Sequence, residues 1–332
     1  MKITKNELKK IINESVEKQL RKTKFNQHSK LVGHRQNKYN KKVNENSNNE
    51  YKYFPKNKRE LKQLITDEIK FKGNDCSLNM INTSKIKDMS RLFFKSNFNG
   101  NVSDWDVSNV TNMSSMFAQS KFDNDTLKDW DVSNVTNMSN MFAQSVFNDD
   151  ISKWNVSKAK NMESMFTFSE FNDDISKWNV GKVKNMANMF SYSKFNGNIS
   201  NWNVANVENM ESMFLDAKFN GNIGNWNISK VESMRLMFSN QSFNQDISNW
   251  NMSNVKSTRS MFYKSIFNGD ISEWDVSNVI DMNLMFYQSK FTGDVSNWNI
   301  NKNCEIQKFG IYNINNYEDF IQYKRDAIIN KI

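Results

Sequence analysis

The residue types that usually carry catalysis or bind transition metals are scarce in this chain. Only 2 of its 332 residues are histidine and 2 are cysteine, namely His28, His34, Cys76 and Cys304. The two cysteines lie far apart in the sequence, and no His/Cys group has the spacing of a zinc site. No glycine-rich phosphate loop and no nucleophile elbow is found. The sequence therefore predicts a protein that is not an enzyme, has no small-molecule substrate and needs no cofactor.

Acidic turns are the remaining groups that could bind a metal ion. Asp123-Asn124-Asp125 and the Asn-Asp-Asp runs at 148–150 and 172–174 offer the oxygen ligands that Ca²⁺ prefers. They lack the spacing of an EF-hand and the glycine-rich nonapeptide of calcium-binding β-helices. We interpret them as structural turns and predict no metal site, with calcium binding as the alternative.

Tryptophan supplies the clearest periodic signal. The chain has 9 tryptophans, spaced 25 residues apart once and 24 residues apart thereafter. They are Trp105, Trp130, Trp154, Trp178, Trp202, Trp226, Trp250, Trp274 and Trp298. Such a row could stack on sugars or nucleic-acid bases. Because each tryptophan shares a phase with an aliphatic residue two positions on, while its neighbours are polar, we interpret the row as a buried structural ladder.

The polar residues beside each tryptophan are better candidates for binding a partner. The candidate face comprises Asp104, Asp106, Asp129, Asp131, Lys153, Asn155, Lys177, Asn179, Glu273 and Asp275. These positions are acidic in the first two units, mixed in the middle of the array and acidic again near its end. Repeat proteins bind through surfaces that vary on a constant frame. We therefore expect a protein partner here, with a role in solubility as the alternative.

The elements that position these residues form a repeat. A phenylalanine series from Phe98 to Phe291 and a Met-Phe pair from Met116-Phe117 to Met285-Phe286 keep step with the tryptophans. Three series with one period predict about nine stacked coils over residues 75–302. A repeated asparagine should hydrogen-bond the backbone of the neighbouring coil. Its members are Asn109, Asn134, Asn206, Asn254 and Asn278.

The pattern within one unit suggests a strand followed by a short helix. Residues 151–156 alternate as a strand does, with a bend expected after Ile151. Ser157 is a suitable helix N-cap. In the preceding unit, apolar residues between 135 and 142 have the spacing of one helical stripe. The sequence thus predicts an α/β fold, a leucine-rich-repeat-like solenoid of 24-residue strand–helix coils with helical caps.

Amphipathic segments flank the repeats. Apolar spacing predicts a helix over 57–70, which lies within an N-terminal helical cap at 53–74. It also predicts a helix over 316–330, with Asn316 as its N-cap, within a C-terminal helical cap at 303–332. Caps shield the apolar faces of terminal coils. A further helix is expected over 4–22, in a basic leader and flexible linker at 1–52.

Positive charge is concentrated in the N-terminal part of the chain. Residues 1–72 contain 20 Lys+Arg and 8 Asp+Glu, a net charge of +12, whereas the whole chain carries +9, which leaves −3 for residues 73–332. Attraction to nucleic acid or to an acidic membrane surface is therefore expected only through residues 1–42. An alternative function follows, an intracellular or assembly-associated scaffold tethered through the basic leader.

The units WDVSNVTNMSSMF (105–117), WDVSNVTNMSNMF (130–142) and WDVSNVIDMNLMF (274–286) closely resemble the DUF285 repeat. This repeat belongs to the BspA-like leucine-rich-repeat surface proteins of bacteria and is common in mycoplasma lipoproteins. The resemblance covers roughly residues 75–302, and PKNKRELKQLITDEIK (55–70) is similar to the helix preceding such repeats. It implies a leucine-rich-repeat-like solenoid, a cell-surface or secreted setting and a role in adhesion or partner binding.

The resemblance and the N-terminal residues lead to different expectations of location. We find no signal peptide, no lipid-accepting cysteine near residue 1 and no apolar run long enough to span a membrane. A surface protein needs an export signal, so a cytoplasmic location is the alternative to the one that the resemblance implies.

Overall fold

The computed structural model describes residues 51–330. These residues belong to two units, residues 51–54 with Met80–Asn82 and Pro55–Asn79 with residues 83–330. In the described part of the first unit, Tyr53 forms a parallel bridge with Ile81. The helix expected over 4–22 and the linker that follows it lie outside the described residues.

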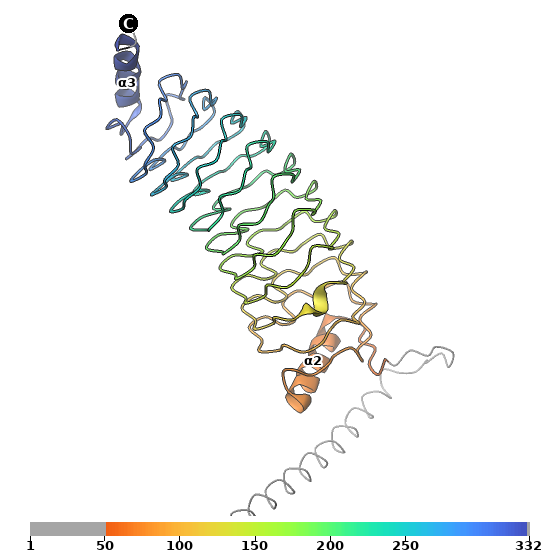
Figure 1. The fold of residues 1–332 in the computed structure, drawn as a ribbon. Helices are drawn as coiled ribbons and strands as arrows, with labels where there is room; N and C mark the ends of the chain where they lie inside the picture. The colour runs from red at the N-terminus through yellow and green to blue at the C-terminus, as the bar shows by residue number, and fades with distance from the viewer. Residues whose placement is uncertain (1–50, 331–332) are drawn as a thin grey trace, which may run out of the picture. The chain divides into compact units, whose positions relative to one another are not determined.

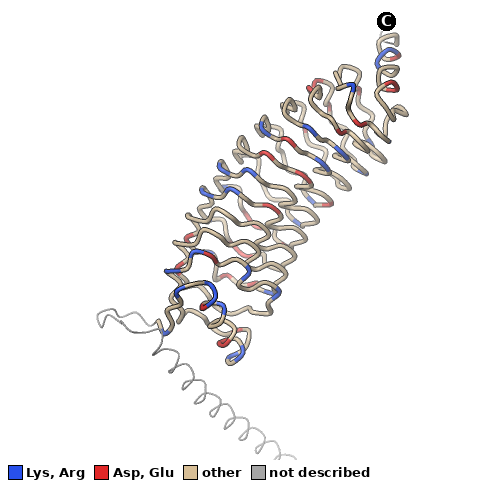
Figure 2. The backbone as a smooth tube through the Cα atoms, turned by 180° about the vertical axis from the view of Figure 1, so that it is seen from behind, with Lys and Arg blue, Asp and Glu red and all other residues tan. Residues whose placement is uncertain are grey.

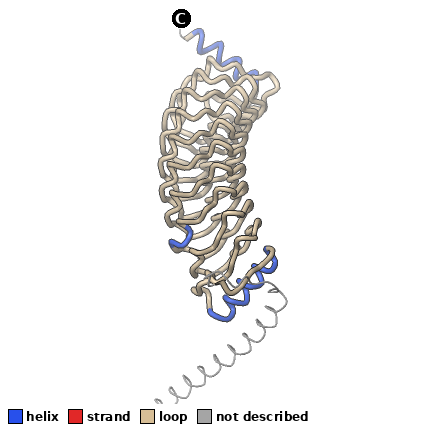
Figure 3. Tube along the Cα trace, turned by 90° about the vertical axis from the view of Figure 1, so that its right-hand side faces the viewer, coloured by secondary structure: helices blue, strands red, loops and turns tan. Residues whose placement is uncertain are grey.

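The second unit is a stack of coils between two helices (Figure 1). In chain order it contains α2 (Lys58–Lys72), the 3-10 turn η1 (Asp125–Leu127) and α3 (Tyr317–Ile329). Throughout residues 51–330 extended structure is limited to isolated β-bridges, and Figure 3 shows helix only at α2, η1 and α3. The predicted α/β, leucine-rich-repeat-like solenoid is therefore wrong, because the coils contain neither strands nor α-helices.

The Met-Phe segment does not form a helix because its backbone donors are used between coils. The N–H groups of Met113 and Phe117 donate to the carbonyls of Asn137 and Met141 in the next coil, both at 2.9 Å. Between them, the N–H of Met116 closes a turn onto the carbonyl of Met113 at 3.1 Å. An α-helix requires each N–H to donate four residues back along the chain. The spacing that resembled a helical stripe instead marks the inward positions of successive turns.

The tryptophan segment also consists of turns and not of a strand. The N–H of Trp154 donates to the carbonyl of Ile151 at 3.1 Å, which is the bend expected after Ile151. A second turn follows, in which the N–H of Ala159 donates to the carbonyl of Val156 at 2.9 Å. Ser157, expected as a helix N-cap, lies inside this turn, and its own N–H donates to the side chain of Asn155.

Two positions in each coil adopt the left-handed backbone conformation. In the first coil they are Ser115 (φ 55°) and Gln119 (φ 56°), and later coils place even Leu236 (φ 59°) and Leu284 (φ 60°) there. This conformation costs a side chain with a Cβ about 1–2 kcal/mol. The regular bonding between coils offsets the cost. No glycine occupies these positions, so the sequence contained no turn signal for them.

Leu284→Asn is expected to raise the stability of the protein. Asparagine tolerates the left-handed conformation far better than leucine, and Leu284 lies at a partly exposed position. The gain in the free energy of unfolding should be at most about 1 kcal/mol, measured by urea denaturation. Leu284→Ala is the control, since it keeps the strain. A less stable Asn variant would show that the apolar contacts of Leu284 outweigh the strain.

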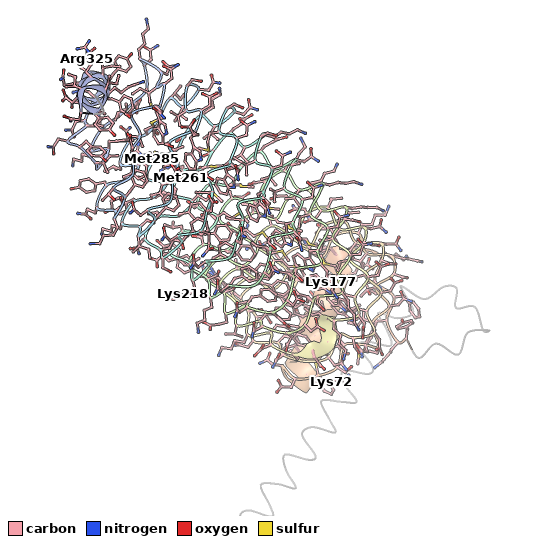
Figure 4. The ribbon with its side chains drawn as sticks, turned by 45° about the horizontal axis from the view of Figure 1, so that its top comes forward. Lys72, Lys177, Lys218, Met261, Met285 and Arg325 are labelled. Atoms are coloured by element: carbon pink, nitrogen blue, oxygen red, sulfur yellow. The ribbon has the colours of Figure 1, made fainter. Side chains whose placement is uncertain are left out.

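The core consists of columns of identical side chains. Phe166, Phe190 and Phe214 stack with 5.7 and 5.8 Å between successive ring centroids. Met261 and Met285 are fully buried in adjacent coils and lie within the stack in Figure 4. Each side chain packs on its copies in the coils before and after it. A coil therefore gains its core only from its neighbours.

The one longer interval between tryptophans is accommodated by η1. The turn between Phe122 and Leu127 contains one residue more than the equivalent turn between Phe147 and Ile151. The extra residue folds into η1, which is capped by the side chain of Asn124. The following tryptophans therefore stay in register.

Both helices expected beside the repeats are present. The predicted helix over 57–70 is α2, with Asn57 as its N-cap and Leu61 and Ile65 buried. The helix expected over 316–330 is α3, in which the side chain of Asn316 accepts from the backbone N–H of Asp319. Phe320 of α3 is buried. Of the helices in residues 51–330, none has the length and apolar character needed to cross a membrane.

Candidate binding surfaces

The tryptophans lie inside the stack. All nine are at most 4 % exposed. The ring of Trp178 stacks at 6.5 Å on Trp154 and at 6.5 Å on Trp202. Its Nε1–H donates to the backbone carbonyl of Ile151 in the preceding coil at 3.1 Å, and the other indoles make the same bond. Neighbouring coils cover both faces of the ring, which leaves no surface on which a sugar or a base could stack.

The residues beside the tryptophans are exposed, but the two sides differ. The residue after each of the first eight tryptophans forms an Asx turn, in which its side-chain oxygen accepts from the backbone N–H two positions on. Among the candidate residues this holds for Asp106, Asp131, Asn155, Asn179 and Asp275, at 3.0–3.2 Å. These side chains shape the coil itself.

The residues before the tryptophans make no such turn. They are Asp104, Asp129, Lys153, Lys177 and Glu273, all exposed. Their charge changes along the stack while the frame beneath them stays constant. They are therefore the half of the candidate face whose side chains do not form turns of their own coil, and among them Glu273 accepts from the side-chain amide of Asn297 in the next coil at 3.1 Å.

Asx turns recur at three places in a coil and explain why the chain is rich in asparagine and aspartate. In the coil of residues 171–194 the acceptors are Asp174, Asn179 and Asn185, which bond the N–H groups of Ser176, Gly181 and Ala187 at 2.8, 3.1 and 3.0 Å. These corners were not predicted from the sequence. The available signal was an Asn or Asp followed two positions later by a small residue, three times per unit.

Two columns of asparagine join successive coils. The predicted column is confirmed: each of its members donates through its side-chain amide to a backbone carbonyl of the preceding coil, as Asn109 does to Ser84 at 3.0 Å. A second column, which was not predicted, follows the phenylalanines. There the side chain of Asn172 accepts from the N–H of Asn196 at 2.7 Å. The repeated Phe-Asn dipeptide was the sequence signal for it.

Aspartates in the Asx turns give the fold a defined acid sensitivity. Serine hydroxyl hydrogen bonds are the main cause of the lowered pKa values of Asp131, Asp150 and Asp275. Serine backbone N–H groups are the main cause of the lowered pKa values of Asp174 and Asp246. A carboxyl with a lowered pKa in the folded state contributes stability above its unfolded pKa and loses it as the pH falls toward the folded pKa.

We therefore expect the free energy of unfolding to decrease as the pH falls below the ordinary aspartate pKa of 3.8. Urea denaturation at a series of pH values measures this. The variant Asp131→Asn/Asp174→Asn should have a flatter acid limb, because asparagine forms the same turn at Asn155 and Asn179. An acid limb equal to that of the unmodified chain would contradict the assignment.

The acidic turns have no geometry that points to calcium. Asp149 has a raised pKa, caused first by its partial burial and then by repulsion from Asp123, Asp125 and Asp173. Within residues 51–330 no three His, Cys, Asp or Glu residues converge as metal ligands would. Its partial burial, together with this repulsion, makes Asp149 easier to protonate.

A second exposed surface lies on the Met-Phe segment, at the second left-handed position of each coil. We call it the variable column. Its members are Lys95, Gln119, Gln144, Phe168, Tyr192, Asp216, Asn240, Lys264, Gln288 and Tyr312. Phe168 and Tyr192 are 51 % and 43 % exposed, and their rings stack at 4.4 Å with 2° between their planes. The column was not predicted from the sequence, because this segment was expected to form a helix.

Comparison with known proteins identifies the repeat. The family model described as "Mycoplasma protein of unknown function, DUF285" matches residues 59–170, 146–242, 167–266 and 216–320. These overlapping matches extend continuously from residue 59 to residue 320, across all of the coils. No curated protein and no solved structure matches the chain. The four matches over most of its length show that this chain belongs to the DUF285 family of repeat proteins.

Proposed function

We propose that the protein is a non-enzymatic repeat protein that binds a protein partner, in a role of the adhesion or surface-interaction type. The variable column is the observation that supports this proposal. Around it, the Asn and Asp side chains of the corners are engaged with backbone, coil after coil. The column itself changes between amide, aromatic, acidic and basic residues. A constant frame with a varied surface is how repeat proteins recognise partners.

The centre of the proposed contact is the aromatic pair Phe168 and Tyr192. The two stacked rings offer a continuous apolar surface in neighbouring coils. An ion pair between Lys194 and Glu170, both partly exposed, lies two residues further along the same coils. Aromatic anchors with a polar rim are the composition of binding hot spots in protein interfaces. This composition favours a protein surface as the ligand.

The test compares binding by the unmodified chain and by Phe168→Ser/Tyr192→Ser. The probes are intact host cells and purified extracellular-matrix proteins, with bound chain measured by quantitative immunodetection. We expect the double variant to bind at least about tenfold more weakly, as expected when two anchors of a hot spot are removed. The control is Gln144→Ser/Asn240→Ser in the same column but outside the aromatic pair, which should weaken binding far less than the aromatic variant does.

Each result has a definite meaning. Equal binding by the aromatic variant and its control would refute the aromatic pair as the contact. Failure of the unmodified chain to bind any of these probes would refute the adhesion role. Circular dichroism should show that both variants remain folded, because the substituted side chains are exposed.

A further inference from the structure

The first four coils carry an ordered series of charges beside their tryptophans. We define the tryptophan segment as the eight residues that begin immediately before each tryptophan. Segments 104–111 and 129–136 each contain two aspartates and no basic residue, whereas segments 153–160 and 177–184 each contain three lysines and no acidic residue. Their net charges are therefore −2, −2, +3 and +3. Side chains of all ten charged residues are exposed.

Hydrogen bonds between coils place these segments side by side in sequence order. The indole N–H of Trp130 donates to Val102 at 3.1 Å, that of Trp154 to Leu127 at 2.9 Å, and that of Trp178 to Ile151 at 3.1 Å. The sign of the charge thus changes once, between the second and the third of these coils. Figure 2 shows both signs of charge along the stack.

Contacts within the chain leave this order of signs in place. Lys158 lies near Asp131, where the sign changes, and lowers the aspartate pKa further after the larger effect of Ser133. Lys184, at the far edge of the basic pair, forms an ion pair with Glu208 at 2.7 Å. Asp150 and Asp174 lie near Lys153 and Lys177 and stay ionised, because serine hydrogen bonds lower their pKa values. Each reduces the charge around its basic segment from +3 to +2 but does not reverse its sign. The outer members, Asp104 and Lys177, remain exposed.

We propose that two copies of this chain associate antiparallel through the tryptophan segments of the first four coils. A two-fold axis at the change of sign brings the first acidic segment opposite the fourth, basic segment of the other copy. The second and third segments face each other in the same way. A parallel arrangement would oppose like charges throughout. The series −2, −2, +3, +3 is therefore self-complementary under the symmetry that most homodimers use.

Exposed charge pairs stabilise a contact only weakly, so the association should be weak and sensitive to salt. Ionic screening acts over about 8 Å at physiological ionic strength, which reduces the attraction further. This surface differs from the variable column.

The experiment measures self-association of the full chain by sedimentation velocity at low and at physiological ionic strength. The acid-reversed variant is Asp104→Lys/Asp129→Lys, and the base-reversed variant is Lys153→Glu/Lys177→Glu. Each alone should raise the dimer dissociation constant by about tenfold, because the acidic segments of the first variant change from −2 to 0 and the basic segments of the second change from +3 to +1, which weakens the attraction between facing segments. An equimolar mixture of the two should associate more tightly than either variant alone, since the +3 segments of the acid-reversed variant then face the −2 segments of the base-reversed variant.

Glu273→Lys is the matched control, because it reverses a charge at the same position of a coil outside the first four and should leave the dimer unchanged. A monomeric unmodified chain at low ionic strength would overturn the proposal. So would a mixture that stays monomeric while both variants keep the circular dichroism spectrum of the unmodified chain. Loss of the dimer in the acid-reversed variant alone would instead indicate contact between the acidic segments and some other basic region.

Discussion

Trp178→Ala is expected to lower the free energy of unfolding by about 3–5 kcal/mol, the range for removing a buried aromatic side chain. Trp178 is 3 % exposed and packs on Trp154 in the preceding coil and on Trp202 in the following coil. The substitution opens a cavity at both contacts and removes the donor that binds the carbonyl of Ile151. Chemical denaturation followed by circular dichroism measures the loss.

Two control variants separate the contributions to this loss. Trp178→Phe keeps most of the ring and removes the indole N–H, so its effect should be about 1–3 kcal/mol, the cost of leaving a buried carbonyl without its donor and some ring volume unfilled. Lys177→Ala, at the exposed neighbouring position, should change stability by less than about 0.5 kcal/mol. An alanine variant as stable as the unmodified chain would show that the tryptophan column is not required for stacking of the coils.

Gly310→Ala is expected to detach the C-terminal segment from the last coil. The backbone of Gly310 has φ 106°, a conformation that side chains with a Cβ rarely adopt. A Cβ there would lie 2.3 Å from the carbonyl carbon of Phe286 and 2.4 Å from the nitrogen of Tyr287. Both are backbone atoms of the bonded stack, so they cannot rotate away. The strained backbone alone should cost about 1–3 kcal/mol, and the overlap adds to it.

Thermal unfolding and limited proteolysis of the C-terminal segment measure this effect. Gly73→Ala is the matched control, because Gly73 also has a positive φ of 95° but no atom within 4 Å of the position of a Cβ. It should show the cost of backbone strain alone. If the two variants lose equal stability and α3 stays resistant to protease, close packing at Gly310 contributes nothing to holding the C-terminal segment.

The sequence by itself determined the register of the array and the composition of its core. A tryptophan, a phenylalanine and a Met-Phe pair that recur at one interval can all be buried only if each stacks on its own copy. The positions of α2 and α3 were also predictable, because their apolar spacing is local and Asn57 and Asn316 are good N-caps. The two helices are determined by residues that are neighbours in the chain, and the register of the array is determined by residues that are exact copies of each other.

Only the tertiary structure decided the conformation inside each coil. An apolar residue every three or four positions fits a helix and fits consecutive turns equally well. The choice depends on where the backbone N–H groups donate, and here alternate donors, such as those of Met113 and Phe117, bond residues one full coil ahead. Local propensity contains no information about a partner 24 residues away. That is why Leu284 could adopt a left-handed conformation that no sequence rule anticipates.

The path of the backbone, which local sequence does not reveal, also distinguishes the candidate binding residues from one another. Asp104 and Asp106 flank one tryptophan and look equivalent in the sequence. In the folded coil Asp106 accepts from the backbone N–H of Ser108, whereas the carboxylate of Asp104 reaches only the neighbouring Ser103 hydroxyl and stays exposed. Which polar side chains stabilise the frame, and which are left for a partner, follows from the path of the backbone between them.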